Sequence, residues 1–171
     1  MNETKKEQQD PLEPLRVALK LEQEGKKFFL ESATKFKSRL ARRTFEFLAA
    51  EEDKHIKRIE EFYHSIESSG QTGLLKIEES TAHLRLAEFN DRLAELRDEI
   101  KPSASDVEAY QYALKFENGA EEFYEKFMNE SDDPNIKRFY RWLIQEEEMH
   151  SKLIHSCMKF ADDPAGWFKE R

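Results

Sequence analysis

Apolar residues recur every three to four positions along most of this chain, which is the spacing of amphipathic helices. A first helix is predicted from Pro14, with Leu21 and Phe28 on its apolar face. A second helix is predicted over about 38–67, and the sequence SSGQTG at 68–73 breaks the periodicity after it. The first part of the chain is therefore predicted to form two long helices.

The second part of the chain contains further helix signals. Apolar residues predict a helix over 84–100, which stops before Pro102. Ser103 or Ser105 can cap the next helix. The sequence SDDP then predicts a stop and a new start, because Asp133 can cap a helix that has Pro134 in its first turn.

This order of elements predicts an all-α fold, a four-helix bundle with a long helical crossover between its second and third helices. Residues 1–13 are predicted to be a flexible tail, and 14–160 the bundle. The crossover with its extra helix is placed at 69–103, and a C-terminal tail at 161–171.

Composition narrows the classes of protein that fit. Thirteen Phe, five Tyr and two Trp can fill a core. The single cysteine, Cys157, excludes an internal disulfide framework and a four-thiolate zinc site, and its place on an apolar face predicts a core residue.

The net charge of −8 disfavours nucleic acid as a partner. With no signal peptide and no apolar run near the ~18 residues of a membrane helix, we expect a soluble, cytoplasmic protein that binds no membrane.

The two halves of the chain are related by an internal repeat. Residues 18–60 align with 113–155 without a gap, and 12 of the 43 positions are identical. A duplicated pair of helices is therefore expected to build the bundle. The identical pairs include Glu22/Glu117, Glu51/Glu146, Glu52/Glu147 and His55/His150.

Two of these pairs form the pattern Glu-x-x-His, and both lie on apolar helix faces. The first is Glu52 with His55, and the second is Glu147 with His150. Glu22 and Glu117 lie likewise on the apolar faces of the first and third long helices. Four carboxylates and two imidazoles are therefore predicted to face the interior, where each unpaired carboxylate would cost several kcal/mol.

The depth of these residues in the bundle is predicted by their distance from the turns. In each hairpin the two inward glutamates are equidistant from the turn, at Lys37 in the first hairpin and at Asp132 in the second. All four are therefore expected at one level.

The other histidines are expected on the surface. Glu61 and His64 also have the Glu-x-x-His spacing, but Glu61 lies about 200° around the helix from a core position, so we expect this pair in solvent. His83 and His155 are likewise expected outside the core.

A metal site explains the inward residues better than two alternatives. Buried salt bridges would need Lys or Arg on the same faces, and none lies there between Ala18 and Phe28 or between Leu48 and Ile59. Protonated Glu–His hydrogen bonds would leave too many acceptors together. Glu and Glu-x-x-His from paired helices are typical of bundles that hold two metal ions. Ligands rich in oxygen favour iron, with manganese as the alternative, over zinc.

The sequence resembles the ferritin-like di-iron carboxylate superfamily and, within it, the rubrerythrin family. The resemblance covers about 14–160 and is carried by ALKLEQEGKKFF with ALKFENGAEEFY, and by AAEEDKH with IQEEEMH. It implies a ferritin-like bundle with two iron ions per chain. It also implies an oxidoreductase that reduces hydrogen peroxide or O2 at this centre.

The resemblance also implies residue roles. Glu52 and Glu147 would bridge the two irons. The terminal ligands would be Glu22 and His55 on one iron, and Glu117 and His150 on the other.

Three positions outside the ligand set compare with the family in different ways. Tyr124 is implied to place a hydroxyl near the metal carboxylates, whereas the equivalent position in the first half is Phe29. Ala120 stands where rubrerythrins usually carry an additional glutamate, and Glu121 follows it. The redox-linked ligand exchange associated with that glutamate therefore lacks its residue here.

A single cysteine cannot supply a rubredoxin domain, so electrons would come from a separate, rubredoxin-like donor protein. We also expect a homo-oligomer. Three alternatives stay open at this point: a ferritin-like ferroxidase that stores iron, a helical adaptor without catalysis, and an O2-dependent hydroxylase.

Overall fold

A computed structural model describes residues 12–73, 76–95 and 104–169 of the chain. Within these ranges it contains six helices and no strand, so the predicted all-α fold is confirmed. The helices are α1 (Leu12–Lys35), α2 (Arg39–Ser69), α3 (Ala82–Glu95), α4 (Ala104–Glu130), α5 (Pro134–Asp162) and α6 (Pro164–Lys169).

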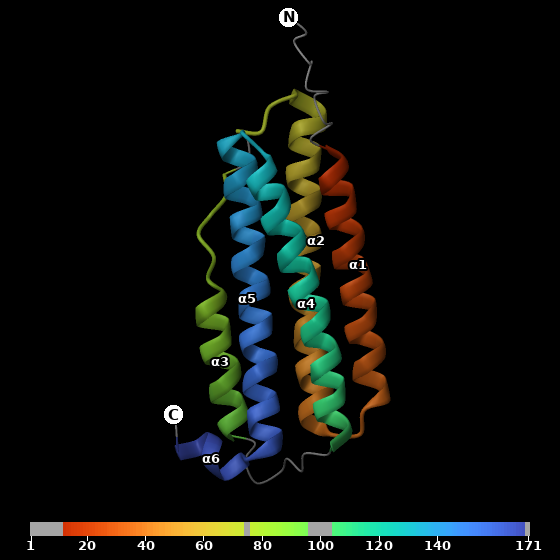
Figure 1. The fold of residues 1–171 in the computed structure, drawn as a ribbon, viewed down its shortest axis with the longest axis vertical. Coiled ribbons are helices and arrows are strands. Elements are labelled where there is room, and N and C mark those ends of the chain that lie inside the picture. The colour runs from red at the N-terminus through yellow and green to blue at the C-terminus, as the bar shows by residue number, and fades with distance from the viewer. Residues whose placement is uncertain (1–11, 74–75, 96–103, 170–171) are drawn as a thin grey trace, which may run out of the picture.

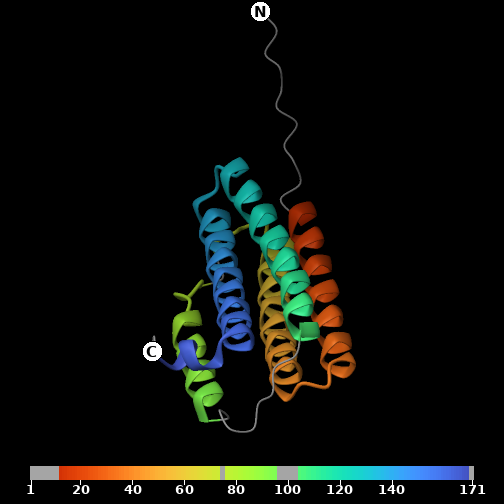
Figure 2. The same ribbon diagram turned by 60° about the horizontal axis from the view of Figure 1, so that its bottom comes forward.

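Four of the helices form an elongated bundle (Figure 1). The hairpin of α1 and α2 packs beside the hairpin of α4 and α5, with α1 against α4 and α2 against α5. The crossover runs from the upper end of α2 and places α3 on the outer side of α5. The same arrangement is seen after rotation in Figure 2, and α6 packs against α5 at the end of the chain.

Local signals account for several helix ends. Ser38 precedes α2, and its Oγ accepts a hydrogen bond from the Ala41 N–H at 3.3 Å. Gly70 ends α2 with φ of 68°, a left-handed conformation that glycine adopts without steric cost. Asp133 caps α5 as predicted, because its Oδ1 accepts from the N–H groups of Asn135 and Ile136 at 2.7 and 3.2 Å.

The helix boundaries differ from the sequence prediction at several ends. Helix α1 begins at Leu12, so Pro14 lies in its first turn and the helix includes the last two residues of the predicted tail, 12–13. Residues 1–11 lie outside the described residues. Helix α3 extends to Glu95, and the rest of the helix predicted over 84–100 lies outside the described residues. Ser103, one of the two candidate caps, also lies outside them. Ser105 is inside α4, which begins one residue earlier.

The predicted C-terminal tail contains structure of its own. Helix α5 continues to Asp162, and α6 follows directly. Trp167 in α6 is 5% exposed, and its Nε1 donates a hydrogen bond to Ser156 Oγ at 3.0 Å. Its ring meets Phe160 edge-on, with the centroids 5.4 Å apart. The end of the chain is therefore attached to the bundle because Trp167 buries its ring there.

The core consists of two apolar clusters with a polar layer between them. One cluster includes Phe29, Phe45, Leu48, Ala113 and Leu153, and the other Ala18, Ile59, Ala120, Phe139 and Leu143. Along each of the four bundle helices, the chain passes from one cluster to the other across one to three buried polar residues. The bundle therefore holds its inward polar side chains away from both ends.

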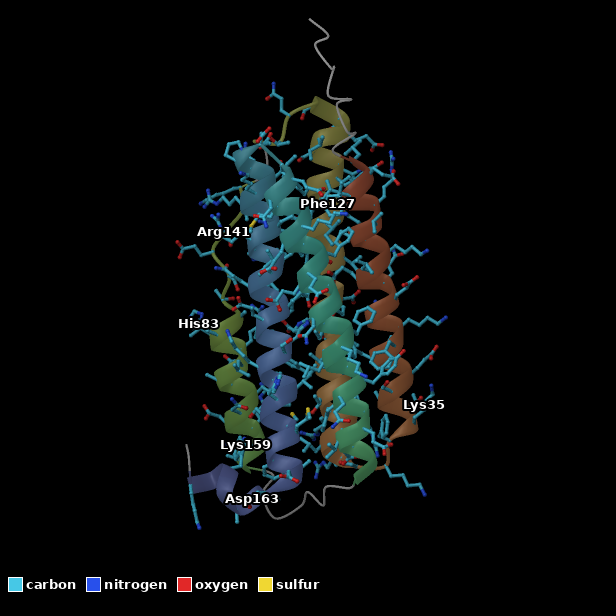
Figure 3. The ribbon with its side chains drawn as sticks, in the orientation of Figure 1. Lys35, His83, Phe127, Arg141, Lys159 and Asp163 are labelled. Carbon is cyan, nitrogen blue, oxygen red and sulfur yellow. The ribbon has the colours of Figure 1, made fainter. Side chains whose placement is uncertain are left out.

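The helix in the crossover, the burial of Cys157 and the exposure of His83 and His155 agree with the sequence prediction. Leu86 and Phe89 of α3 pack against the first apolar cluster, so this helix covers the bundle. Cys157 is fully buried, and burial raises the pKa of its thiol to about 12. His155 is exposed, and so is His83, which lies on the outer side of α3 (Figure 3). None of the helices in the described ranges combines the length and the apolar character that a membrane span requires.

The cap of α5 generates a stability prediction. Replacing Asp133 by Ala removes two capping hydrogen bonds and the bond that Thr72 Oγ1 donates to Oδ2 at 2.6 Å. We expect a loss of about 1–2 kcal/mol in the free energy of unfolding, measured by urea denaturation. Asp132 is exposed, so D132A serves as the control and should change stability by less than about 0.5 kcal/mol. Equal effects of the two variants would contradict the capping role.

Candidate metal centre

All six residues that the sequence predicts as metal ligands are buried in the polar layer. Their exposed fractions lie between 0% and 2%, and every bundle helix contributes to the set. Helices α1 and α4 provide one glutamate each, whereas α2 and α5 provide Glu-x-x-His pairs. The residues are Glu22, Glu52, His55, Glu117, Glu147 and His150.

His55 faces three of these carboxylates through one ring nitrogen. Its Nδ1 donates a hydrogen bond to Glu22 Oε2 at 3.1 Å. The same nitrogen lies 3.3 Å from Glu52 Oε2 and 3.3 Å from Glu147 Oε1. Three carboxylate oxygens from three helices therefore converge on one imidazole nitrogen.

His150 has an equivalent environment in the second half of the repeat. Its Nδ1 lies 3.2 Å from Glu117 Oε1, 3.2 Å from Glu147 Oε2 and 3.4 Å from Glu52 Oε1. The two imidazole rings are stacked with their centroids 5.0 Å apart. Glu52 and Glu147 thus each direct one oxygen to His55 and the other oxygen to His150.

The chemistry of this layer fits a pair of metal ions. Glu52, His55, Glu147 and His150 each offer one ligand atom within a group whose members all lie within 4.8 Å of one another. Several of the buried ligand atoms have no hydrogen-bond partner among the described residues, including both oxygens of Glu117 and both of Glu147. Buried carboxylate oxygens without donors are costly unless a cation binds them. The residues present therefore suit the ions that the repeat predicts.

The two terminal glutamates of this layer have raised pKa values. Burial, together with the carboxylates of Glu52 and Glu147, raises the pKa of Glu22. Burial also raises the pKa of Glu117, although His150 opposes the shift. Metal binding must therefore displace protons from the terminal glutamates.

The pKa values of the two imidazoles are also raised, whereas those of the two shared carboxylates, Glu52 and Glu147, are lowered. Burial alone would lower the pKa of His55, but Glu22 and Glu147 outweigh it and raise that pKa. Glu117 likewise outweighs burial and raises the pKa of His150. Burial and Glu52 would raise the pKa of Glu147, but both histidines lower it. The raised pKa values favour the protonated form of both histidines in the metal-free protein, so metal binding must displace these protons as well.

Tyr124 is fully buried and lies at this layer, as the sequence predicts. Its hydroxyl donates a hydrogen bond to Glu22 Oε1. Phe29, the equivalent residue in the first half, is buried in the first apolar cluster and has no hydroxyl. Tyr124 therefore holds one terminal glutamate, whereas its counterpart cannot.

Small residues beside the layer serve close packing. A Cβ atom on Gly25 would lie 2.6 Å from the Phe116 ring and 3.6 Å from Glu52 Cδ. Gly25 therefore lets α4 and the Glu52 carboxylate approach α1. Ala120 is 5% exposed and belongs to the second apolar cluster, whereas Glu121 is only partly buried and lies near Glu148. Glu121 does not take the place of the additional glutamate.

A second pair of buried glutamates was not predicted as functional. Glu51 and Glu146 are each 2% exposed and precede Glu52 and Glu147. The ion pair at Glu51 joins its Oε2 to Arg85 Nε of α3 at 2.7 Å. A further ion pair joins Arg85 to Glu146. Identity of Glu51 and Glu146 across the repeat was a usable signal, but nothing in the sequence indicated that Arg85 would reach them.

Glu146 also contacts the candidate ligands. Its Oε2 lies 3.7 Å from His55 Nε2, and its Oε1 accepts a hydrogen bond from Ser80 Oγ at 2.6 Å. Burial would raise the pKa of Glu146, but these contacts and Arg85 lower it. The crossover therefore supplies two groups, Ser80 and Arg85, that hold a carboxylate behind His55.

The third Glu-x-x-His pair lies outside the layer, as predicted. Glu61 pairs with Arg58 at 2.8 Å, with its side chain 55% exposed. The His64 side chain is 71% exposed and lies 3.2 Å from Glu67. The Glu-x-x-His spacing alone is therefore insufficient to identify a candidate metal ligand. A pair on the apolar face of its helix is buried in the polar layer, whereas a pair on the polar face is exposed.

The four-helix bundle and its buried layer of Glu and His place the protein in the class of ferritin-like proteins. The rubrerythrin family model matches residues 13–158, which is most of the chain. The chain therefore belongs to the rubrerythrin family. No curated protein and no solved structure matches it.

The protonation of the layer predicts an unusual pH dependence for the metal-free protein. Both histidines have a folded pKa above the ~6.5 of the unfolded chain, so the stability they contribute is complete below that pH. It is lost as pH rises through the folded pKa values. We expect the melting temperature of chelator-treated protein to fall between pH 6 and pH 8, and iron-loaded protein to diverge upward from it.

The control for this experiment is H64A, which removes an exposed histidine and should leave the slope unchanged. Scanning calorimetry on both proteins, with and without metal, gives the comparison. A metal-free protein that gains stability toward pH 8 would contradict the proposed protonation of the layer.

Proposed function

We propose that the protein is a di-iron oxidoreductase that reduces hydrogen peroxide, or O2, with electrons from an external donor. The observation that supports this most directly is the sharing of Glu52 and Glu147 between His55 and His150 at 3.2–3.4 Å. A carboxylate that directs one oxygen to each imidazole can bind two ions at once. The family membership supports the same assignment.

Two iron ions per chain are the metal complement that the ligand types favour. Four carboxylates and two imidazoles are hard donors of high negative charge, which suits iron or manganese better than zinc. Glu22 and His55 would hold one ion together with Glu52 and Glu147, and Glu117 with His150 would complete the other position. Manganese in place of iron remains an outcome that metal analysis distinguishes.

Held by these residues, two Fe(II) ions would supply the two electrons that one peroxide needs, with two protons, to become two water molecules. The chain's own groups prepare the site for this reaction. Tyr124 fixes the orientation of Glu22 through its hydroxyl, and Glu146 contacts His55 from behind. The apolar clusters on both sides exclude water from the layer, which strengthens its electrostatic interactions.

The electron donor is proposed to be a separate rubredoxin-like protein. Fe–S and rubredoxin centres need several thiolates, and the chain has one cysteine, which is buried. We also propose a homo-oligomer in the cytoplasm as the working form. Each turnover oxidises the centre, so reaction continues only while this donor reduces it again.

Metal content gives the first test. We expect two ions per chain in the wild type and almost none in the double variant E52A/E147A, because each carboxylate serves both ions. Elemental analysis after anaerobic Fe(II) loading measures this. The double variant E61A/H64A is the matched control, since it removes the same residue types from the surface and should retain both ions. Full retention in E52A/E147A would rule out this site.

The reaction gives the second test. Di-ferrous protein should be oxidised faster by hydrogen peroxide than by air-saturated buffer in stopped-flow absorbance. Without a donor it should react once and stop, since the single cysteine of these 171 residues cannot form a thiolate-bound iron centre that relays electrons. A faster reaction with O2, followed by a growing ferric mineral on retained iron, would favour the ferritin-like storage alternative over peroxide reduction.

A further inference from the structure

The two halves of the polar layer have the same ligand types but different supporting contacts. The His55 position comprises Glu22, His55 and one oxygen from each shared glutamate, Glu52 Oε2 and Glu147 Oε1. The His150 position comprises Glu117, His150 and the other oxygen of each shared glutamate. By ligand set alone, the internal repeat makes these two positions equivalent.

The terminal glutamate of the His55 position is held by a neighbour. The Tyr124 hydroxyl donates to Glu22 Oε1, which leaves Oε2 as the oxygen that faces His55. Glu117 has no such neighbour: neither of its oxygens has a hydrogen-bond partner among the described residues. The repeat equivalent of Tyr124 is Phe29, which has no hydroxyl to donate.

The imidazole of the His55 position is also supported from behind. Glu146 Oε2 lies 3.7 Å from His55 Nε2, and Ser80 and Arg85 of the crossover hold that carboxylate. Neither His55 Nε2 nor His150 Nε2 has a hydrogen-bond partner among the residues that the structure describes, but only His55 Nε2 has a described carboxylate within ion-pair distance. The carboxylate that Ser80 and Arg85 hold therefore lies beside the His55 ring, and the described residues place no counterpart beside His150 Nε2.

We propose that the two metal positions are inequivalent, with the His55 position binding its ion first and more tightly than the His150 position. This inference rests on the proposed two-metal site. Groups that orient metal ligands typically change metal affinity by about 10–100-fold. Tyr124 and Glu146 act here as positioning residues, because each contacts a ligand and neither is in the proposed ligand set.

Two single variants separate the positions. H150Q removes the imidazole of the unsupported position, and H55Q removes that of the supported one. We expect metal-free H150Q to bind one Co(II) about 10-fold or more tightly than H55Q does, measured by anaerobic calorimetric titration and by the visible absorption of bound Co(II). Equal affinities of the two variants would overturn the proposal.

Combined variants identify the supporting residues. Y124F and E146Q should each weaken Co(II) binding in the H150Q background by about 10–100-fold, and leave binding in the H55Q background nearly unchanged. Y140F is the control for Y124F, because Tyr140 is a buried tyrosine whose hydroxyl has no hydrogen-bond partner among the described residues. E148Q controls for E146Q, since Glu148 pairs with Lys152 at the surface. Equal losses in both backgrounds would contradict the assignment.

The intact ligand set gives an independent measurement. Wild-type protein should bind Co(II) in two resolved steps, and Y124F should weaken the first step without weakening the second. Two identical steps in the wild type would contradict the inequivalence while leaving the two-metal site intact. Absence of Co(II) and Fe(II) binding by the wild type would instead contradict the proposed function itself.

Discussion

Charge balance inside a buried layer is the constraint on which this bundle depends. Four carboxylates and two imidazoles lie between two apolar clusters, so bulk solvent does not screen them. Even with both imidazoles protonated, four ionised carboxylates leave the layer negative. The balance must come from protons on the terminal glutamates, whose pKa values are raised, or from metal ions. The same burial that makes the layer costly without a cation favours the binding of a cation there.

The crossover neutralises the charge of a neighbouring pair of buried glutamates with an arginine. Glu51 and Glu146 are also buried, but Arg85 of α3 lies in ion-pair contact with both. The chain therefore neutralises the outer pair with its own cation, whereas no Lys or Arg among the described residues forms an ion pair with the six residues of the inner layer. Helix α3 has two roles in this arrangement, since it covers α5 with Leu86 and Phe89 and also brings Arg85 to Glu146. Through Glu146, a segment outside the four-helix bundle contacts His55 of the candidate metal centre.

Much of this could be read from the sequence because the repeat and the helical period supplied independent constraints. Glu22 and Glu52 were expected at one level from their distances to the turn, and both now lie within 3.3 Å of His55 Nδ1. Arg85 could not be predicted, because it lies outside the repeat and its contacts depend on how the crossover docks on α5. Tyr124 was expected near the carboxylates, but only the packed structure shows that its hydroxyl reaches Glu22. Helix α6 was missed because a six-residue helix has little periodicity and depends on the burial of Trp167.

The most direct test of the account is a crystal structure of the iron-loaded protein with anomalous diffraction data on both sides of the iron absorption edge. The account predicts two anomalous peaks inside the polar layer, one beside His55 Nδ1 and one beside His150 Nδ1, with Glu52 and Glu147 each contacting both. A single peak, or iron bound only at surface carboxylates such as Glu61, would contradict a centre shared between the two halves of the repeat.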